Sequence, residues 1–147
     1  MDIPIIALCD SAVDYSGKLV VVGTFDTIAP ETVPFILDQC CVALRLIIRQ
    51  GHEKKDKHSL RIEIADDEDN FIIQPLDATF EINLGNAPFA ASNLVFTLRQ
   101  IPFARAGLHE LHVSLDGRRR ANIPLLVQVR KDLLPHQNQA GSSKREK

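Results

Sequence analysis

The sequence predicts an all-β protein, an antiparallel β-sandwich of two sheets with about eight strands. Short segments rich in valine, isoleucine, leucine, threonine and phenylalanine alternate apolar with polar residues, which is the two-residue period of a half-buried strand. Clusters of glycine, proline, aspartate and asparagine separate these segments. The chain has 147 residues, 45% of them hydrophobic, which is typical of one globular domain. We assign residues 1–130 to the sandwich and the polar residues 131–147 to a flexible tail.

The first two predicted strands are joined by a tight turn near the N-terminus. Ile3–Val13 is followed by the turn Asp14–Gly17, in which glycine supplies a positive φ, and by a second strand, Lys18–Ile28. Pro30 and Pro34 then bracket a crossing segment, because proline cannot donate a hydrogen bond to a β-ladder.

The next segment, Phe35–Arg49, is long enough to be a helix. The alternation of Val42, Leu44 and Leu46 and the β-branched residues near its end favour a strand. A charged loop over residues 50–57 follows it.

The later strands alternate more clearly. They are predicted at His58–Ala65, Phe71–Gln74, Ala78–Leu84, Asn93–Gln100, Leu108–Leu115 and Ala121–Arg130. The connections are the polar turn Asp66–Asn70, the loop Gly85–Ser92 and the hairpin turn Asp116–Gly117.

One late segment indicates the type of sandwich. Immunoglobulin-like sandwiches often begin a core strand with glycine, an aromatic residue two positions later and a core residue two further, and the aromatic side chain ties a corner to the backbone. Gly107, His109 and Leu111 have this spacing, with histidine in the aromatic position. We therefore expect an immunoglobulin-like sandwich.

The N-terminal segment carries a more specific pattern. Residues 7–12 read ALCDSA and residues 17–26 read GKLVVVGTFD, and GLHELHVSLDG and IPLLVQV follow later. With these motifs the sequence resembles a family of uncharacterised bacterial proteins, a domain of unknown function. The resemblance covers residues 1–130 and implies a small intracellular β-sandwich, but no activity, substrate or cofactor.

Asp10 is the first candidate site residue, because it interrupts an apolar stretch. If Val13 pairs with Lys18 across the turn, Asp10 lies opposite Val21 on an apolar face. A carboxylate in such a place is hydrogen bonded, or its pKa rises. Two roles are open to it: an acid or ion ligand of a site, or an acceptor of backbone N–H groups at a bulge or strand end.

Asp26 is the second candidate site residue. The same pairing puts it opposite Ile5, so that it is not a cross-strand neighbour of Asp10 and the two aspartates form no catalytic dyad. We assign no catalytic, cofactor-binding or metal-binding residue on this basis.

Two charged segments could bind a metal ion. Asp66–Asp69 collects carboxylates that calcium could use, but it lacks the spacing of an EF-hand loop and is expected to be a solvated turn. His52, Glu53, Asp56 and His58 crowd one loop, where nothing fixes their geometry. We expect no metal at either place.

The cysteines and the paired histidines have structural interpretations. The number of cysteines is odd, and Cys40 and Cys41 are adjacent on a predicted strand, so the cysteines are poorly placed to form disulfides with each other or with Cys9. We therefore expect buried free thiols in a reducing compartment. His109 and His112 are three residues apart on a predicted strand and therefore face opposite sides.

Several functional classes are disfavoured. The sequence lacks Gly-x-Ser-x-Gly, phosphate-loop and dinucleotide-binding motifs. A formal charge of −2 excludes a surface that is basic throughout, and with it general nucleic-acid binding. Arg118, Arg119 and Arg120 at a hairpin tip could meet phosphates or an acidic partner, although such charges usually serve solubility.

The aromatic residues also argue against stacking sites for sugars or single-stranded nucleic acid, because they make up only 5% of the chain. Phe71, among others, is in phase with a strand core. Phe89 and Phe103 lie beside prolines in predicted loops and are the candidates for exposed apolar contacts, although covering an end of the sandwich is the commoner role.

These observations predict a non-enzymatic protein-interaction or structural module of the bacterial cytoplasm, acting through a sheet face or an unpaired edge strand, with homodimerisation as one form. The partner is expected to be a protein, this chain or another, and neither nucleic acid nor a membrane; no stretch has the length of a membrane-spanning helix. The alternative is a small-ligand or metal-ion-binding sandwich. An enzyme would need a pocket joining Asp10 or Asp26 to a histidine.

Overall fold

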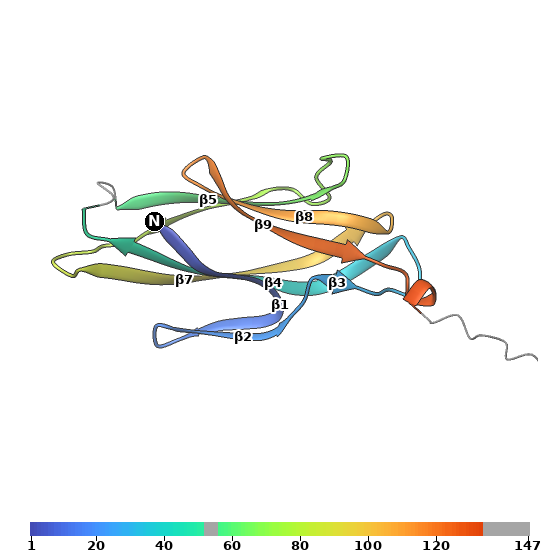
Figure 1. The fold of residues 1–147 in the computed structure, drawn as a ribbon, viewed down its shortest axis with the longest axis horizontal. Coiled ribbons are helices and arrows are strands. Elements are labelled where there is room, and N and C mark those ends of the chain that lie inside the picture. The colour runs from blue at the N-terminus through green and yellow to red at the C-terminus, as the bar shows by residue number, and fades with distance from the viewer. Residues whose placement is uncertain (52–55, 134–147) are drawn as a thin grey trace, which may run out of the picture.

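The computed structural model describes residues 1–51 and 56–133 and has an all-β fold in two sheets (Figure 1). Sheet A has the strand order β2-β1-β4-β7, and sheet B has the order β3-β9-β8-β5-β6. The strands of sheet A are β2 (Lys18–Thr24), β1 (Asp2–Tyr15), β4 (Phe35–Arg49) and β7 (Phe89–Phe103). Those of sheet B are β3 (Thr27–Ile28), β9 (Arg118–Val127), β8 (Gly107–Leu115), β5 (Lys57–Asp66) and β6 (Leu76–Glu81).

The all-β prediction with two sheets is confirmed, with nine strands in place of about eight. Neighbouring strands are antiparallel except β3 and β9, which are parallel. In the described part of the chain there is no α-helix, only a short 3-10 segment at Arg130–Leu133, and no helix with the length and apolar character of a membrane span.

The core lies between the two sheets and is formed by alternate residues of the strands that face each other. Its buried members include Leu8, Val42, Leu44, Leu46, Leu60, Ile62, Ile64, Ile101, Leu111, Val113, Leu125 and Val127. Their spacing of two along each strand is the pleat that the alternation predicted.

Phe35–Arg49 forms β4 with the predicted bounds, so the strand interpretation is correct and the helical one is wrong. β7 is longer than predicted, because it pairs with β4 along the whole of that strand, from Phe35 opposite Phe103 to Arg49 opposite Phe89. The second half of the predicted loop Gly85–Ser92 is therefore strand.

Two other predicted strands are wrong. Lys18–Ile28 is divided, because the chain leaves sheet A after β2 and enters sheet B as β3. Phe71–Gln74 is not a strand: Phe71 makes an isolated bridge to Ala65 and its ring is exposed rather than in the core.

All three cysteines are buried free thiols, as predicted, and the two adjacent ones point to opposite faces. Cys40 lies in the core between the sheets, whereas Cys41 lies on the outer face of sheet A beside Cys9. Burial raises the pKa of the Cys40 thiol to about 12, and it also raises that of Cys9. Neither is therefore a reactive thiolate at neutral pH.

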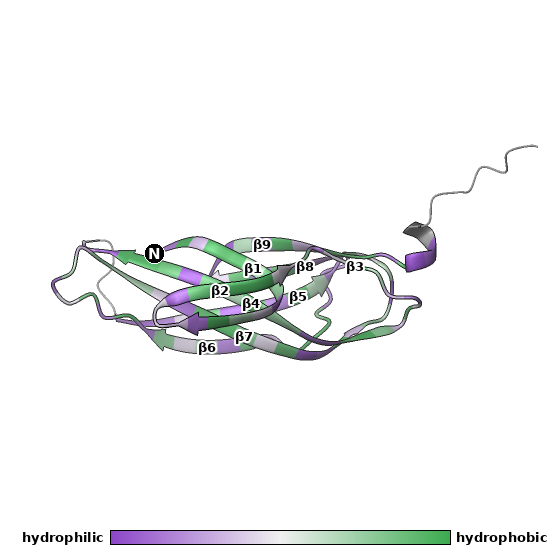
Figure 2. Cartoon of the chain, turned by 90° about the horizontal axis from the view of Figure 1, so that it is seen from below, coloured by the Kyte–Doolittle hydropathy of each residue, from purple (hydrophilic) through white to green (hydrophobic). Residues whose placement is uncertain are grey.

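β1 doubles back on itself, which the sequence did not predict. Residues 2–9 pair with β4, whereas residues 11–15 pair only with β2, and Cys9 pairs with both strands. Figure 1 shows the second half of β1 returning with β2 beneath the rest of sheet A. We call this two-stranded hairpin, residues 11–24, the arm; in Figure 2 it is seen from below, crossing in front of β4 and coloured largely as hydrophobic.

Candidate functional site

The corner at which β1 turns back contains Asp10. The arm has a two-residue turn, Ser16–Gly17, instead of the predicted four, so Tyr15 pairs with Lys18 and Asp10 lies opposite Gly23 rather than Val21. A shift of two residues preserves the face of the strand, so Asp10 remains on the predicted side. Its side chain is exposed, which contradicts the expectation of a carboxylate on a covered apolar face.

Gly23 makes this corner possible. Its φ is +67°, and a Cβ atom added there would collide with the carboxylate of Asp10 and crowd its Cβ. The glycine thus provides both the left-handed backbone and the space that Asp10 occupies. Asp10 therefore lies against Gly23, at the point where the pairing of β1 passes from β4 to β2.

Asp26 connects the two sheets. Its backbone carbonyl accepts a hydrogen bond from the N–H of Leu126 at 2.8 Å, and its carboxylate accepts one from the Thr27 hydroxyl at 3.0 Å. The predicted pairing with Ile5 is wrong, because the chain has left sheet A before Asp26. Asp26 borders a cavity of about 380 Å³ whose lining includes Phe25 but not Asp10, so the two candidate residues do not share that cavity.

The inner face of the arm packs against small residues of sheet A. Cys9, Cys41 and Ala43 are buried there, and the arm covers them. The covering residues are Ala12, Leu19 and Val21. Small side chains at these positions of sheet A leave room for a second layer of backbone.

Polar contacts tether the tip of the arm to sheet A. Arg45 donates to the carbonyl oxygen of Gly17 at 3.3 Å and to the side-chain oxygen of Asn93 at 2.8 Å. Asn93 in turn donates to the Asp14 carboxylate at 2.9 Å. The backbone N–H of Gly17, followed by the Asn93 amide, lowers the pKa of Asp14.

The outer face of the arm is apolar and exposed. Tyr15 is 67% exposed, Val22 58% and Val13 54%, and Val20 is exposed beside them. Four large apolar side chains on one face of a two-stranded hairpin are unusual for a surface in water, and contiguous exposed apolar residues mark interaction sites.

The edge of β2 is also open. In the described residues β2 pairs with β1 on one side, and no strand pairs with its other side. An open edge presents unpaired N–H and C=O groups to any extended chain. The arm therefore combines an apolar face with a free backbone edge.

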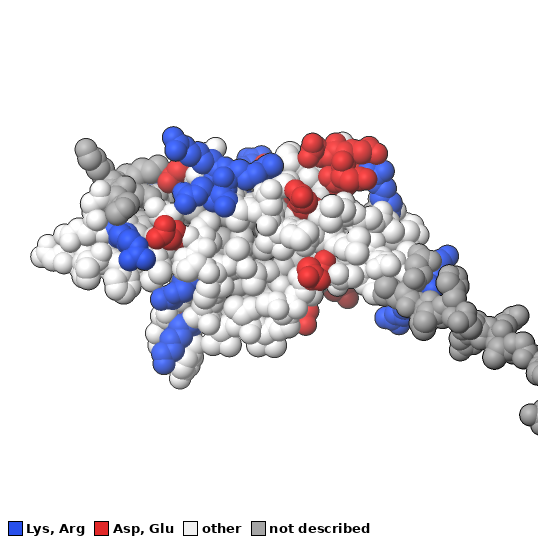
Figure 3. Space-filling model, viewed as in Figure 1, with Lys and Arg blue, Asp and Glu red and all other residues white. Residues whose placement is uncertain are grey.

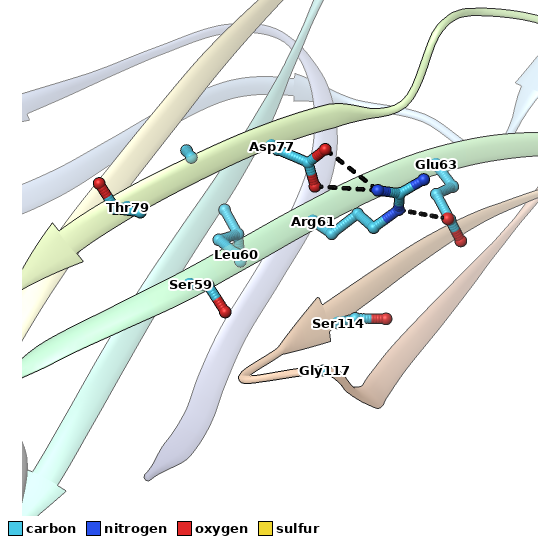
Figure 4. A pocket seen from close by; sticks show the side chains of 9 residues that line it. Ser59, Leu60, Arg61, Glu63, Asp77, Thr79, Ser114 and Gly117 are labelled. Carbon is cyan, nitrogen blue, oxygen red and sulfur yellow. Dashed lines mark hydrogen bonds and ion pairs between the residues drawn. The ribbon is translucent and has the colours of Figure 1, made fainter.

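The outer face of sheet B holds a second candidate, a cavity of about 690 Å³ between β5, β6 and the β8–β9 turn (Figure 4). Arg61 lies at its centre and donates to Glu63 at 2.7 Å and to both carboxylate oxygens of Asp77 at 3.0 and 3.2 Å. Glu63 also lies 3.9 Å from Arg119. The charges thus neutralise one another across the strands, and hydroxyl groups of Ser59 and other residues line the rest of the cavity.

The carboxylates of Asp66, Asp67 and Glu68 in the turn at residues 66–69 are bound by a protein group. Arg105 donates to Asp66, Asp67 and Glu68 at 2.9–3.1 Å. In the described residues no group of three or more metal-ligating side chains could hold an ion, and residues 52–55 of the histidine-containing loop lie outside them. Figure 3 shows this acidic turn at one end of the molecule and basic side chains gathered nearer the β8–β9 hairpin.

Asp66 organises that turn and makes its stability depend on pH. The hydrogen bond from the backbone N–H of Asn70 is the largest cause that lowers the pKa of Asp66 from its ordinary value of 3.8 to about 2. Because the folded pKa is depressed, the stabilisation is present above about pH 4 and is lost as the pH falls towards 2. We expect Asp66→Asn to lower the melting temperature at pH 7 and to differ less from the wild type at pH 2, with Asp67→Asn as the exposed control.

The histidines lie on opposite faces of β8, as predicted. His109 faces the core, where its Nδ1 lies 3.1 Å from the carbonyl of Gly107 and its ring contacts Phe103 edge-on. His112 is buried on the outer face with its Nδ1 3.0 Å from the side-chain oxygen of Asn122. They cannot share a ligand.

Sequence reasoning missed the arm as a separate layer. The signal was present in the continuous apolar run Leu19–Val22, because a strand with one face in solvent alternates apolar and polar residues, whereas a continuous apolar run does not. The prediction placed this segment only beside its neighbouring strand. Apart from Gly23, nothing in the sequence indicates the bend after Cys9.

Comparison with known proteins gives a family and a distant structural likeness. Residues 4–128 match the model of a family of unknown function (DUF6941). No curated protein matches the chain at a significant level. Among the solved structures that match is Pseudomonas fluorescens alkylpurine DNA glycosylase AlkC bound to DNA containing an abasic site analog, with 14% identity and a TM-score of 0.42. The alignment covers 71% of this chain and 28% of the glycosylase chain.

Proposed function

The chain belongs to a family of unknown function, DUF6941, and we propose that it is a non-enzymatic protein-interaction module that binds its partner through the arm. The observation that carries the proposal is the exposed outer face of the arm, where Val13, Tyr15 and Val22 lie beside an open strand edge. Apolar surface of this kind is stabilised when a partner removes it from water.

The ionisable groups support an interaction role over a catalytic one. Asp26 accepts a hydrogen bond at the sheet crossing, Asp66 organises a turn, Glu63 is neutralised by Arg61, and His109 packs in the core. Each therefore has a structural partner. A cytoplasmic setting in a bacterium is part of the proposal, and the buried free thiols are compatible with a reducing compartment.

We also propose that the sandwich is immunoglobulin-like. The contact of the His109 ring nitrogen with the carbonyl of Gly107 supports this, because it ties the start of a core strand to the backbone as the aromatic corner residue of that fold does.

Partner capture with arm variants tests the interaction role. We expect tagged wild-type protein to capture a partner from the native host that Val22→Lys loses, because the lysine places a charge on the apolar face. Ile36→Lys is the matched control, since Ile36 is 54% exposed on β4, outside the arm, against 58% for Val22. An untagged copy of this chain counts as a partner. The proposal would be overturned if Val22→Lys captured the same proteins as Ile36→Lys, or if the wild type captured none.

A second candidate function is binding of a small ligand in the cavity on sheet B. Its volume of about 690 Å³ and the hydroxyl groups of Ser59, Thr79 and Ser114 beside Arg61 favour it. A specific ligand raises the melting temperature by an amount that grows with the logarithm of its concentration relative to Kd. We expect a shift with some member of a panel of metabolites that Arg61→Ala abolishes, and a flat panel would exclude this function for the compounds tested.

A further inference from the structure

We propose that Arg119, Arg120 and Asn122 form a binding site for a phosphate monoester, in a hollow of about 350 Å³ that they line on β9 together with Ala121. The hollow shares no residue with the arm or with the larger cavity of Figure 4, so the inference goes beyond both proposed functions. It gives a role to the arginine run at the start of β9, which neither of those functions uses.

A β-bulge brings the two arginines to one place. Arg119 pairs with Ser114 and Ala121 pairs with Val113, so Arg120 is an extra residue on β9. Successive side chains of a regular strand point to opposite faces, which would separate the two guanidinium groups. The bulge interrupts this alternation, and both arginines line the same hollow. A run of arginines that served only solubility would not require this convergence.

Both guanidinium groups retain donors for a ligand. Arg120 donates from Nη2 to the carbonyl oxygen of Met1 at 2.6 Å, which holds the group in place, and no other described residue accepts a hydrogen bond from it. Arg119 donates no hydrogen bond within the described part of the chain, because its Nη2 lies 3.9 Å from Glu63, beyond hydrogen-bond distance. Glu63 instead accepts a hydrogen bond from Arg61 at 2.7 Å. The N–H groups of Arg119 are therefore available to an anion.

Asn122 adds a neutral donor to the hollow. Its side-chain oxygen lies 3.0 Å from Nδ1 of His112, and because a carbonyl oxygen can only accept, this ring nitrogen carries the proton. The bond uses the oxygen of the amide, and its NH2 group has no acceptor among the described residues. The hollow is thus lined by two guanidinium groups and one amide donor, with no side-chain acceptor left free. Such a set of donors binds an anion.

The number of donors and charges fits a phosphate monoester. Arginine binds phosphate oxygens through paired N–H groups, and two arginines match the charge of about −1.5 to −2 that a monoester carries at neutral pH. Its three terminal oxygens can each accept from one of the three side chains. A carboxylate brings a single charge and two oxygens, so we expect it to bind more weakly.

The surrounding charges favour a single phosphate group over a nucleic acid. Figure 3 shows basic side chains gathered near the β8–β9 hairpin and acidic ones towards the other end of the molecule. Beyond the hollow, Glu110 pairs with Pro124, and the acidic turn at residues 66–69 follows on the neighbouring strand. Carboxylates at these places repel a phosphate backbone that extends along the sheet, whereas a small monoester does not reach them.

Titration calorimetry with methyl phosphate at constant ionic strength tests the site. We expect the wild type to bind methyl phosphate at least about tenfold more tightly than acetate. Arg119→Gln and Asn122→Asp should each weaken binding of methyl phosphate at least about tenfold, because the first removes charged donors and the second places a carboxylate in the hollow. Urea unfolding without ligand shows that each variant is folded.

Arg118→Gln is the matched control, because Arg118 is an exposed arginine of the same run that does not line the hollow. It changes the net charge as Arg119→Gln does, and we expect it to weaken binding by less than about twofold, since an exposed charge outside the site is screened. Equal weakening by the two variants would show a diffuse attraction and would overturn the site.

The remaining outcomes concern the ligand. A wild type that binds no methyl phosphate overturns the inference and leaves the interaction role of the arm to its own test. A single-stranded oligonucleotide that binds much more tightly than methyl phosphate, and that Arg119→Gln releases, overturns the monoester in favour of a polyanion. Titration with a short phosphoserine peptide identifies the source of the monoester: affinity equal to that of methyl phosphate supports a free metabolite, and tighter binding supports a phosphorylated side chain of a partner.

Discussion

Phe103→Ala is expected to lower the free energy of unfolding by about 3 to 5 kcal/mol, which is the usual cost of emptying a buried phenylalanine site. Phe103 is 0% exposed, and its ring lies edge-on to His109 with centroids 5.1 Å apart. The substitution removes the ring and also leaves a buried imidazole without its packing partner. Urea unfolding of the wild type and the variant measures the difference.

Phe89→Ala is the matched control, because Phe89 begins the same strand and is 52% exposed. We expect it to change the free energy of unfolding by less than about 1 kcal/mol. Equal losses in the two variants would show that Phe103 is not buried in the core. The pair is informative because both residues lie beside a proline and were predicted to occupy loops.

The difference between these two phenylalanines shows what local pattern can and cannot provide. Alternation identified β4, β5 and β8 within a residue or two, because each buries one face on the same core and the period is regular. It ended β7 too early, because Pro102 suggested a loop. The length of β7 is set instead by its pairing with β4, which is a non-local contact.

The candidate site was predictable only in part. Asp10 and Gly23 were recognisable as unusual residues in the N-terminal hairpin. Their contact was not predicted, because the turn has two residues instead of the predicted four and the pairing register of the hairpin differs accordingly. The exposed face of the arm could not be predicted, because a strand with apolar residues on both faces is normally buried on both. Here one face covers sheet A and the other meets solvent.

Gly23→Ala is expected to destabilise the protein by about 1 to 3 kcal/mol, because a residue with a Cβ must adopt a left-handed backbone and the exposed side chain of Asp10 must move aside. Gly17→Ala separates the two causes, because Gly17 also has a positive φ, +79°, but nothing lies within 4 Å of the added Cβ. We expect Gly17→Ala to lose only the part of the unfolding free energy that comes from the left-handed backbone.

The double variant Asp10→Ala/Gly23→Ala isolates the collision itself. Removing the carboxylate frees most of the space that the new Cβ needs, so the double variant should be more stable than Gly23→Ala by about 1 kcal/mol or more, although Asp10→Ala alone changes little. Urea unfolding of the four proteins gives this coupling. Hydrogen exchange at Cys9 and Cys41, beneath the arm, should increase in Gly23→Ala and return towards the wild type in the double variant, since the corner that holds the arm against sheet A is restored. A Gly23→Ala protein as stable as Gly17→Ala would contradict this account of the corner.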